Sequence, residues 1–492
     1  MTRIYRLPLV HAPITNLSTE ADETTFLQSK SRSVILHSIA MLTLVLVGGT
    51  VVLCAVAFVR YMTANHGVLR KMGIEHPATS WFLGNFDQAF KYGVFEMQRV
   101  FYNKYKDKKV YGWYDARRPA IVVRDLDIVK DICVKNFNSF IDRHTLFDAE
   151  PPLRDNLLNL RGEHWRRVRN TLSPTLTCIS DLTFLLSHIN QLVNNFREVL
   201  HRLLRHDRQA EFREERSDLR EKQNQGEQER VRVQHFLGFN GEFVLGIFEG
   251  VNLQAKPSAG DDVQGEAGTD LSQLNIFAAF YKCTFSSSLQ GQAIVFILAG
   301  YDTVATVLSF TLFFLAMHPE CCQKAQAEVD AKCGKEFPDY DKVQTLTYLD
   351  MCINEAIRLV PPGIFLNRKC VQDTDIQGVH FPKDMIVVIP VYAFHTDPDL
   401  FPEPEKFDPE RFNPENKTTR HQYAHLPFGQ GPRNCIGMRL ALLELKIVMA
   451  AILQKLTPVP CSKTVYPIKL SKMQAKAQDG LWVKFQLRDA KT

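Results

Sequence analysis

The chain has 492 residues, of which 45% are apolar and 23% are charged, with a formal net charge of +5. These values resemble those of average globular proteins, and they exclude a wholly disordered, collagen-like or coiled-coil chain. The mean hydropathy of −0.16 excludes a polytopic membrane protein, and the mild, evenly spread charge does not indicate nucleic-acid binding. The 11 cysteines include no Cys-x-x-Cys pair, so we expect reduced thiols in a protein that faces the cytosol.

The first distinctive element is an uncharged apolar run at residues 34–59. With a rise of about 1.5 Å per residue, a helix of this length spans a hydrocarbon core of about 30 Å. The run is too long for a signal-peptide core, and no small-residue cleavage site follows it. We therefore expect four parts in chain order: a polar N-terminal tail at 1–33, a transmembrane anchor at 34–59, a linker at 60–77 and one large catalytic domain at 78–492.

Basic residues flank both ends of this run, and their distribution favours a cytosolic C-terminal part only weakly. The flanking residues are Lys30 and Arg32 on one side, and Arg60, Arg70 and Lys71 on the other. The glycosylation sequon at Asn16 is usable only if the tail is lumenal. The sequon at Asn416 would never be glycosylated in a cytosolic domain.

Beyond the linker, the pattern predicts a mainly helical domain with a minor β portion. Helices are expected at residues 97–106, 126–136, 163–204 and 440–456, and throughout most of 290–360. Strands are expected at 110–115, 120–125, 373–381, 385–394, 465–473 and 480–487. The densely charged stretch at 204–233 indicates a solvated helix or a disordered insert.

A second apolar run, residues 293–317, is also long enough to span a membrane. It carries Asp302 near its centre, where a charge in lipid costs several kcal/mol. Gly300, Asp302, Thr303 and Thr306 together form a polar interruption of the run. Such a notch is either a helix-packing detail or one wall of a site, and this segment alone does not decide between the two.

The most informative segment is FGQGPRNCIG, residues 428–437. Its glycines allow the backbone to approach a flat ligand closely, and amide N–H groups can then point at the sulfur of Cys435. Arg433 can pair with an acidic group of that ligand. A helix predicted just after Cys435 would favour a thiolate at its N-terminus. Taken alone, the segment could equally hold a buried structural cysteine in a glycine-rich turn.

This segment resembles the haem-binding loop of the cytochromes P450, FxxGxRxCxG, at every specified position. Further motifs of that family follow its order and spacing: AGYDT at Ala299–Thr303, EAIR at Glu355–Arg358, PERF at Pro409–Phe412, and WxxxR formed by Trp165 and Arg169. The resemblance is nearly continuous from about residue 290 onward. It is greatest to the microsomal, drug- and steroid-oxidising animal members, and it implies a cytochrome P450-like fold.

The resemblance implies haem b as cofactor, with its iron ligated by the Cys435 thiolate. It also assigns haem contacts to Arg433, Trp165, Arg169, Arg368, Phe428 and Ala299. Arg143 is a further candidate for holding a propionate. The alternative for each arginine is an ordinary surface charge.

Two catalytic residues are implied on the second apolar run. The Thr303 hydroxyl would relay protons during oxygen activation, and the Asp302 carboxylate would feed that relay through water. The alternative is a threonine that bonds back to its own helix. The same resemblance implies that this helix is buried over haem rather than spanning lipid. It also assigns Glu355, Arg358 and Arg411 to a buried, structural ion-pair network.

The implied activity is that of a haem-thiolate monooxygenase acting on a lipophilic small molecule, which is a xenobiotic, a steroid or a fatty-acid-like compound. Electrons would come from NADPH through NADPH–cytochrome P450 reductase, with cytochrome b5 as a further partner. Arg166, Arg167 and Arg439 form either a basic docking face or a generic solvated face. The implied location is the endoplasmic reticulum membrane, as a single-pass protein with a cytosolic catalytic domain.

One region departs from the family. Residues 233–253 resemble the segment before the F helix, yet the oxygen-activating motif begins already at Ala299. We therefore expect a shortened F–G region, which would give an open pocket, reflect a splice or gene-model variant, or impair haem binding. Two other functions are considered: a non-catalytic or impaired haem-binding membrane protein, and a P450-type isomerase or dehydratase. The Asp302–Thr303 pair argues against the second, because such enzymes need no proton relay.

Overall fold

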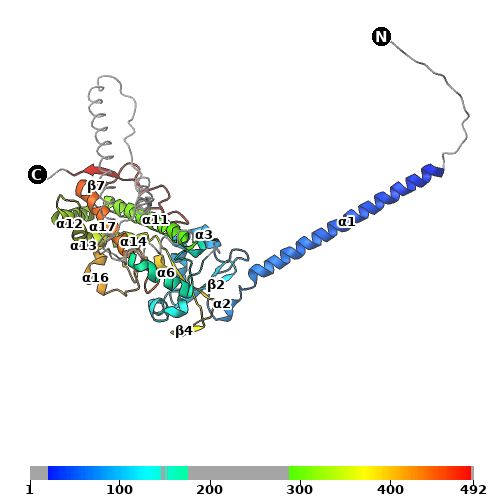
Figure 1. Cartoon of the computed structure of the whole chain (residues 1–492), viewed down its shortest axis with the longest axis horizontal. Coiled ribbons are helices and arrows are strands. Elements are labelled where there is room, and N and C mark those ends of the chain that lie inside the picture. Colours follow the sequence, from blue (N-terminus) through cyan, green and yellow to red (C-terminus); the bar gives the residue numbers. More distant parts are fainter. Residues whose placement is uncertain (1–19, 146–149, 152, 176–286, 489–492) are drawn as a thin grey trace, which may run out of the picture. The chain divides into compact units, whose positions relative to one another are not determined.

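The computed structural model describes residues 20–145, 150–151, 153–175 and 287–488 (Figure 1). The chain divides into two units, Met1–Asn65 and His66–Thr492. The expected insert at 204–233, the segment 233–253 and the shortened F–G region lie outside the described residues. Most of the helix predicted at 163–204 also lies outside them.

The first unit contains one long helix, α1 (Glu20–Thr63). Its part from His37 to Thr63 is long and apolar enough to cross a membrane, and this part is not buried by the protein. The hydroxyls of Thr43 and Thr50 donate to the carbonyls of Ile39 and Leu46, one turn earlier. Such back-bonds satisfy polar side chains within an apolar helix.

The second unit is mainly helical. Its described helices are α2 (Val68–Lys71), α3 (Asp87–Tyr92), α4 (Val94–Lys104), α5 (Leu126–Lys130), α6 (Gly162–Thr175), α11 (Ser287–Met317), α12 (Pro319–Cys333), α13 (Tyr340–Gln344), α14 (Thr347–Leu359), α15 (Val391–His395), α16 (Pro414–Thr418) and α17 (Met438–Lys455). Single short turns are η1 (Asp131–Lys135), η2 (Phe137–Phe140), η3 (Leu153–Asp155) and η5 (Pro409–Phe412). The predicted mainly α fold with a minor β portion is thus confirmed.

The main sheet brings distant segments together in the order β1-β2-β6-β3. Its strands are β1 (Val110–Asp115), β2 (Arg118–Val123), β6 (Ile386–Ile389) and β3 (Leu366–Lys369). β2 runs parallel to β6, while the pairs β1–β2 and β3–β6 are antiparallel. Two further antiparallel pairs are β4 (Thr374–Ile376) with β5 (Val379–Phe381), and β7 (Leu456–Val459) with β8 (Lys484–Leu487).

Two strand predictions were wrong. The strand expected at 385–394 ends at Ile389, because Pro390 has no N–H for a sheet ladder and instead precedes α15. The segment 465–473 forms no strand, although Leu470 makes an isolated β-bridge with Ala477.

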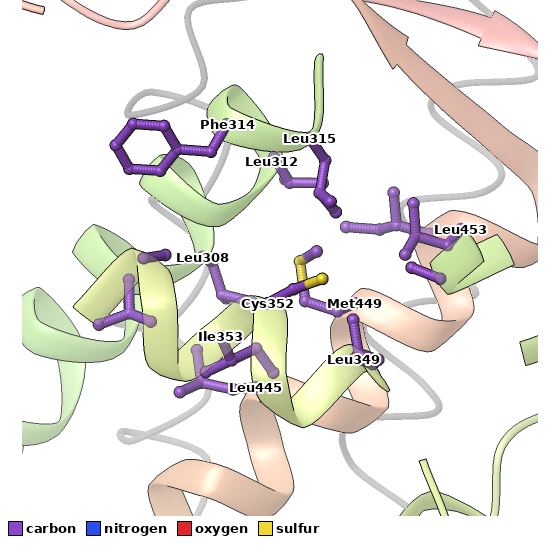
Figure 2. Packing of buried hydrophobic residues seen from close by; sticks show 14 of the residues in the cluster. Leu308, Leu312, Phe314, Leu315, Leu349, Cys352, Ile353, Leu445, Met449 and Leu453 are labelled. Carbon is purple, nitrogen blue, oxygen red and sulfur yellow. The ribbon is translucent and has the colours of Figure 1, made fainter. Parts of the chain in front are cut away.

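The largest hydrophobic cluster joins α11, α14 and α17 (Figure 2). Leu308, Leu312 and Leu315 of α11 meet Cys352 of α14 and Met449 of α17 there. The C-terminal half of the second apolar run is therefore a core helix. Its packing fixes the direction of α11, which carries the polar notch, against α17, which begins just after Cys435.

A buried ion-pair network ties α14 to the loops before the glycine-rich segment. Arg358 and Arg411 both lie against the carboxylate of Glu355, which also accepts a hydrogen bond from the Asp408 N–H at 2.9 Å. Arg358 additionally donates to the His395 carbonyl at 2.7 Å. The three charged side chains are buried, so this network fixes the positions of three chain segments relative to one another.

Candidate functional site

The glycine-rich loop 428–437 places Cys435 at the entrance to α17. Gly429 and Gly431 have φ values of +70° and +79°, and a Cβ on Gly431 would lie 2.0 Å from the Cys133 carbonyl oxygen. Only glycine fits that position. The Cys435 N–H donates to the Phe428 carbonyl at 2.8 Å and closes the loop. The loop thus presents the cysteine two residues before Gly437, the N-cap of α17.

Cys435 keeps surface that is open to solvent. Partial burial raises the pKa of its thiol, while the Gly437 N–H and the charges of Arg169 and Arg143 act to lower it. The net direction is upward, so without a ligand the thiol stays protonated at neutral pH. Metal coordination would displace this proton, and the same N–H and guanidinium groups would then stabilise the thiolate.

Four arginines gather beside this loop: Arg143, Arg169, Arg368 and Arg433. Burial lowers the pKa of all four guanidinium groups, to about 10 for Arg143 and to about 9 for Arg433. Repulsion from the other arginines of the cluster lowers the values for Arg143 and Arg433 further. The cluster is therefore a concentration of positive charge, which the nearby Asp142 carboxylate offsets only in part at Arg433.

The hydrogen bonds of Arg433 and Arg169 fix the cluster to the loop. Arg433 donates to the carbonyls of Ile141, Leu158 and Leu160, and its guanidinium carbon lies 4.6 Å from the centre of the buried Trp165 ring. Arg169 donates to the Asn434 carbonyl and side-chain oxygens, both at 2.9 Å.

The other two arginines also donate to backbone carbonyls. Arg143 donates to the Arg433 carbonyl at 3.1 Å, and Arg368 donates to the carbonyl of Asn367. The structure thus brings Cys435, Trp165 and all four predicted arginines to one place.

The donor set fits the haem that the sequence resemblance implies. The Nε atoms of Arg143, Arg368 and Arg433 are buried and have no hydrogen-bond partner, a costly state that anionic groups would relieve. Within the described ranges, no group of three or more His, Cys, Asp or Glu side chains could hold a metal ion.

Most of the polar notch of α11 lies on a part of the helix that the core does not cover, although its last residue, Thr306, is buried. Ala299, Asp302 and Thr303 are exposed, and a Cβ on Gly300 would meet nothing within 4 Å. The Thr303 hydroxyl donates to the Ala299 carbonyl at 2.5 Å, which is the back-bond considered as an alternative for this residue. Phe428 packs against the same core cluster as Val304, so one cluster touches both the notch and the cysteine loop.

Sequence reasoning missed two contributors. Asn434 orients Arg169 through two hydrogen bonds, and its place inside the motif was the available signal. Lys476 lies with its Nζ 3.5 Å from the Asp302 carboxylate. No sequence signal marks Lys476, because it lies in a C-terminal segment far from any of the motifs.

Comparison with known proteins identifies the family. The family model described as Cytochrome P450 matches residues 75–215 and 285–483. Cytochrome P450 3A29 of Sus scrofa is 32% identical over 457 residues, which cover 84% of this chain and 90% of the relative. Cytochrome P450 3A31 of Mesocricetus auratus is 32% identical over 504 residues, covering 91% and 99%. Cytochrome P450 3A7 of Homo sapiens is 32% identical over 461 residues, covering 83% and 90%. The chain belongs to the cytochrome P450 family and is a monooxygenase of that kind.

Proposed function

We propose that this cytochrome P450 inserts one atom of dioxygen into a lipophilic small molecule at a haem iron ligated by Cys435. The observation that carries the assignment of the site is the solvent-open thiol beside four guanidinium groups, three of which have buried, unpartnered Nε atoms. When bound, the haem supplies an iron that activates dioxygen, and its thiolate ligand pushes electron density toward the oxygen.

The chain's own groups hold the cofactor in this proposal. Cys435 would hold the haem iron as a thiolate, with the Gly437 N–H as a hydrogen-bond donor to its sulfur. Arg143, Arg368 and Arg433 direct their free N–H groups at the propionates, in charge-assisted hydrogen bonds. The Trp165 ring holds the Arg433 guanidinium in place through the cation–π contact. Phe428 and Ala299 would contribute apolar contacts to the haem.

In this proposal Asp302 supplies protons, and Thr303 holds the group that receives them. The Thr303 hydroxyl donates its hydrogen to the Ala299 carbonyl. Its oxygen can therefore only accept a hydrogen bond from a bound molecule. It therefore holds a protonated group in place rather than a bare anion. Asp302, the residue before Thr303, has an exposed carboxylate that takes up protons from water.

Electrons are proposed to come from NADPH through NADPH–cytochrome P450 reductase, with cytochrome b5 as a second donor. Arg167 and Arg439 are exposed. Val168 and Leu172 of α6 pack against the same hydrophobic cluster as Ile436, which lies just before α17. Arg166 instead bonds Asn138 at 3.0 Å, so we assign docking to Arg167 and Arg439. Helix α1 is proposed to anchor the protein in the endoplasmic reticulum membrane, with the catalytic domain in the cytosol.

Oxygen labelling tests this function directly. The full chain is reconstituted with the reductase in membranes and supplied with NADPH, ¹⁸O₂ and a panel of xenobiotics, steroids and fatty acids. We expect a product that carries one ¹⁸O atom, and no product without NADPH or the reductase. A product whose added oxygen comes from water, or turnover that does not require NADPH, would contradict the proposal.

A further inference from the structure

A short hairpin near the C-terminus holds Lys476 in a fixed backbone position. Ser471 N–H donates to the Lys476 carbonyl at 2.7 Å, and Gln478 N–H donates to the Lys469 carbonyl at 2.8 Å. Leu470 and Ala477 form the bridge between the two arms. These bonds close the turn on both sides of Lys476, so its backbone has little freedom.

The hairpin is attached to elements other than α11. The Val94 N–H donates to the Lys472 carbonyl at 2.7 Å, and the Lys472 amine donates to the Phe90 carbonyl at 3.0 Å. Leu470 and Ala475 pack in the cluster of Ala89, Val94 and Phe95. The hairpin is therefore anchored on α3 and α4, and its residues Leu470, Ala475 and Ala477 also pack against the core cluster that contains α11.

From this hairpin, the Lys476 ammonium reaches Asp302, the neighbour of Thr303, at 3.5 Å. The two side chains are 41% and 62% exposed. An exposed pair at this separation is weak, because water solvates both charges and screens their attraction. An ammonium also has three N–H donors, so Lys476 can bind a second carboxylate at little cost.

Exposed apolar side chains lie on the elements that flank this ion pair. Leu298 is 63% exposed and lies one helical turn before Asp302, on the same side of α11. Phe365 is 42% exposed and follows Ile364, which packs in the same cluster as the hairpin. An apolar surface next to a single weakly held cation matches a molecule with an apolar chain and one acidic end.

We infer that Lys476 is a specificity-determining residue that binds the carboxylate of an acidic amphiphile, such as a long-chain carboxylic acid. Its ammonium then pairs with both this carboxylate and Asp302. This inference rests on the proposed function and selects the fatty-acid-like class among its substrates. Because Asp302 repels the bound carboxylate and competes for the ammonium, the two residues have opposite effects on affinity for the acid. Neither affects a neutral ester of the same chain length.

The test measures the spin-state shift of the haem-loaded, full-length protein in nanodiscs during titration with dodecanoate and with methyl dodecanoate. We expect Lys476→Met to weaken dodecanoate binding at least tenfold and to change ester binding less than twofold. Asp302→Asn should tighten dodecanoate binding several-fold, and Lys476→Arg should bind it like the unaltered protein. Lys469→Met, an exposed lysine of the same hairpin, is the matched control and should change neither affinity.

The outcomes separate the two claims. Equal affinities for acid and ester in the unaltered protein and in Lys476→Met would overturn the inference, and so would weaker acid binding in Asp302→Asn. Neither result contradicts the proposed function if the proteins contain haem whose spectrum shows thiolate ligation. A failure of the unaltered protein to take up haem would instead contradict the proposed function itself.

Discussion

Arg358 donates two hydrogen bonds to the carboxylate of Glu355, at 2.7 and 2.8 Å, and both side chains are fully buried. The residues are three apart on α14, so they share one face of the helix. The same carboxylate accepts the Asp408 N–H. One buried charge pair thus joins the core helix to the segment that precedes η5.

We predict that Glu355→Gln destabilises the folded protein by about 3–5 kcal/mol, because it leaves the Arg358 charge buried without its partner. The measurement is the free energy of unfolding, or the yield of folded protein if the variant does not fold. The control is Glu96→Gln, which breaks another pair at the same i,i+3 spacing, but one in which Glu96 and Arg99 are 43% and 39% exposed. Its effect should stay below about 1 kcal/mol. Equal losses for both variants would contradict a special role of the buried network.

Glu444 predicts a pH dependence of stability. Burial on α17 raises the pKa of its carboxyl from 4.5 to about 7. Between pH 4.5 and about pH 7 the folded state therefore binds more protons than the unfolded chain. The free energy of unfolding falls as the pH rises through this range. Above pH 7 the buried charge costs about 3 kcal/mol relative to the protonated form.

Glu444→Gln should remove this loss of stability at high pH. It should raise the free energy of unfolding at pH 8 more than at pH 5. Denaturant unfolding at both values measures the difference. Glu415→Gln, on the exposed surface of α16, should leave the pH profile in place. A Glu444→Gln profile that is as steep as that of the unaltered protein would show that this carboxyl is not the source.

Thr303→Ala should uncouple NADPH consumption from product formation and release peroxide, because the hydroxyl that holds the protonated group is lost. The control is Thr311→Ala, since Thr311 makes the same back-bond, to the Val307 carbonyl at 2.7 Å, but within the core. The ratio of product to NADPH should fall several-fold in the first variant and stay near normal in the second. An unchanged ratio in Thr303→Ala would rule out the relay.

The proposed docking face at Arg167 and Arg439 predicts that a charge reversal weakens reductase binding in a salt-dependent way. Arg439→Glu should raise the apparent KM for the reductase several-fold at low ionic strength, and the difference should shrink as salt screens the charges. The carbon monoxide spectrum should stay normal. Lys484→Glu, at an exposed position of β8, should leave the KM for the reductase unchanged. A defect of equal size in both variants would indicate a general charge effect instead of a docking site.

Much of the fold and of the site was predictable, because it depends on contiguous motifs. The loop around Cys435 needs glycine at Gly431, where a side chain would collide with Cys133, and such a requirement is visible in the sequence. The core part of α11 was visible as an apolar run interrupted at Asp302. Pro390 marked the end of β6, although the apolar pattern around it suggested a longer strand.

Contacts between distant segments were not predictable in the same way. Arg143 donates to the Arg433 carbonyl across 290 positions of the chain, and nothing near Arg143 indicates this bond. Lys476 reaches Asp302 because α3, α4 and the core cluster of α11 together hold its hairpin in place. The back-bond of Thr303 was one of two alternatives in the sequence, since a threonine in a helix can donate to its own backbone or face a ligand.

The central claim is that Cys435 ligates a haem iron. The most direct test is the Soret band of the reduced full-length protein under carbon monoxide. We predict the red-shifted band typical of thiolate ligation, its loss in Cys435→Ala, and its retention in Cys461→Ala, which removes a partly exposed thiol elsewhere in the domain. A red-shifted band that survives in Cys435→Ala, or its absence from the unaltered protein, would contradict the account.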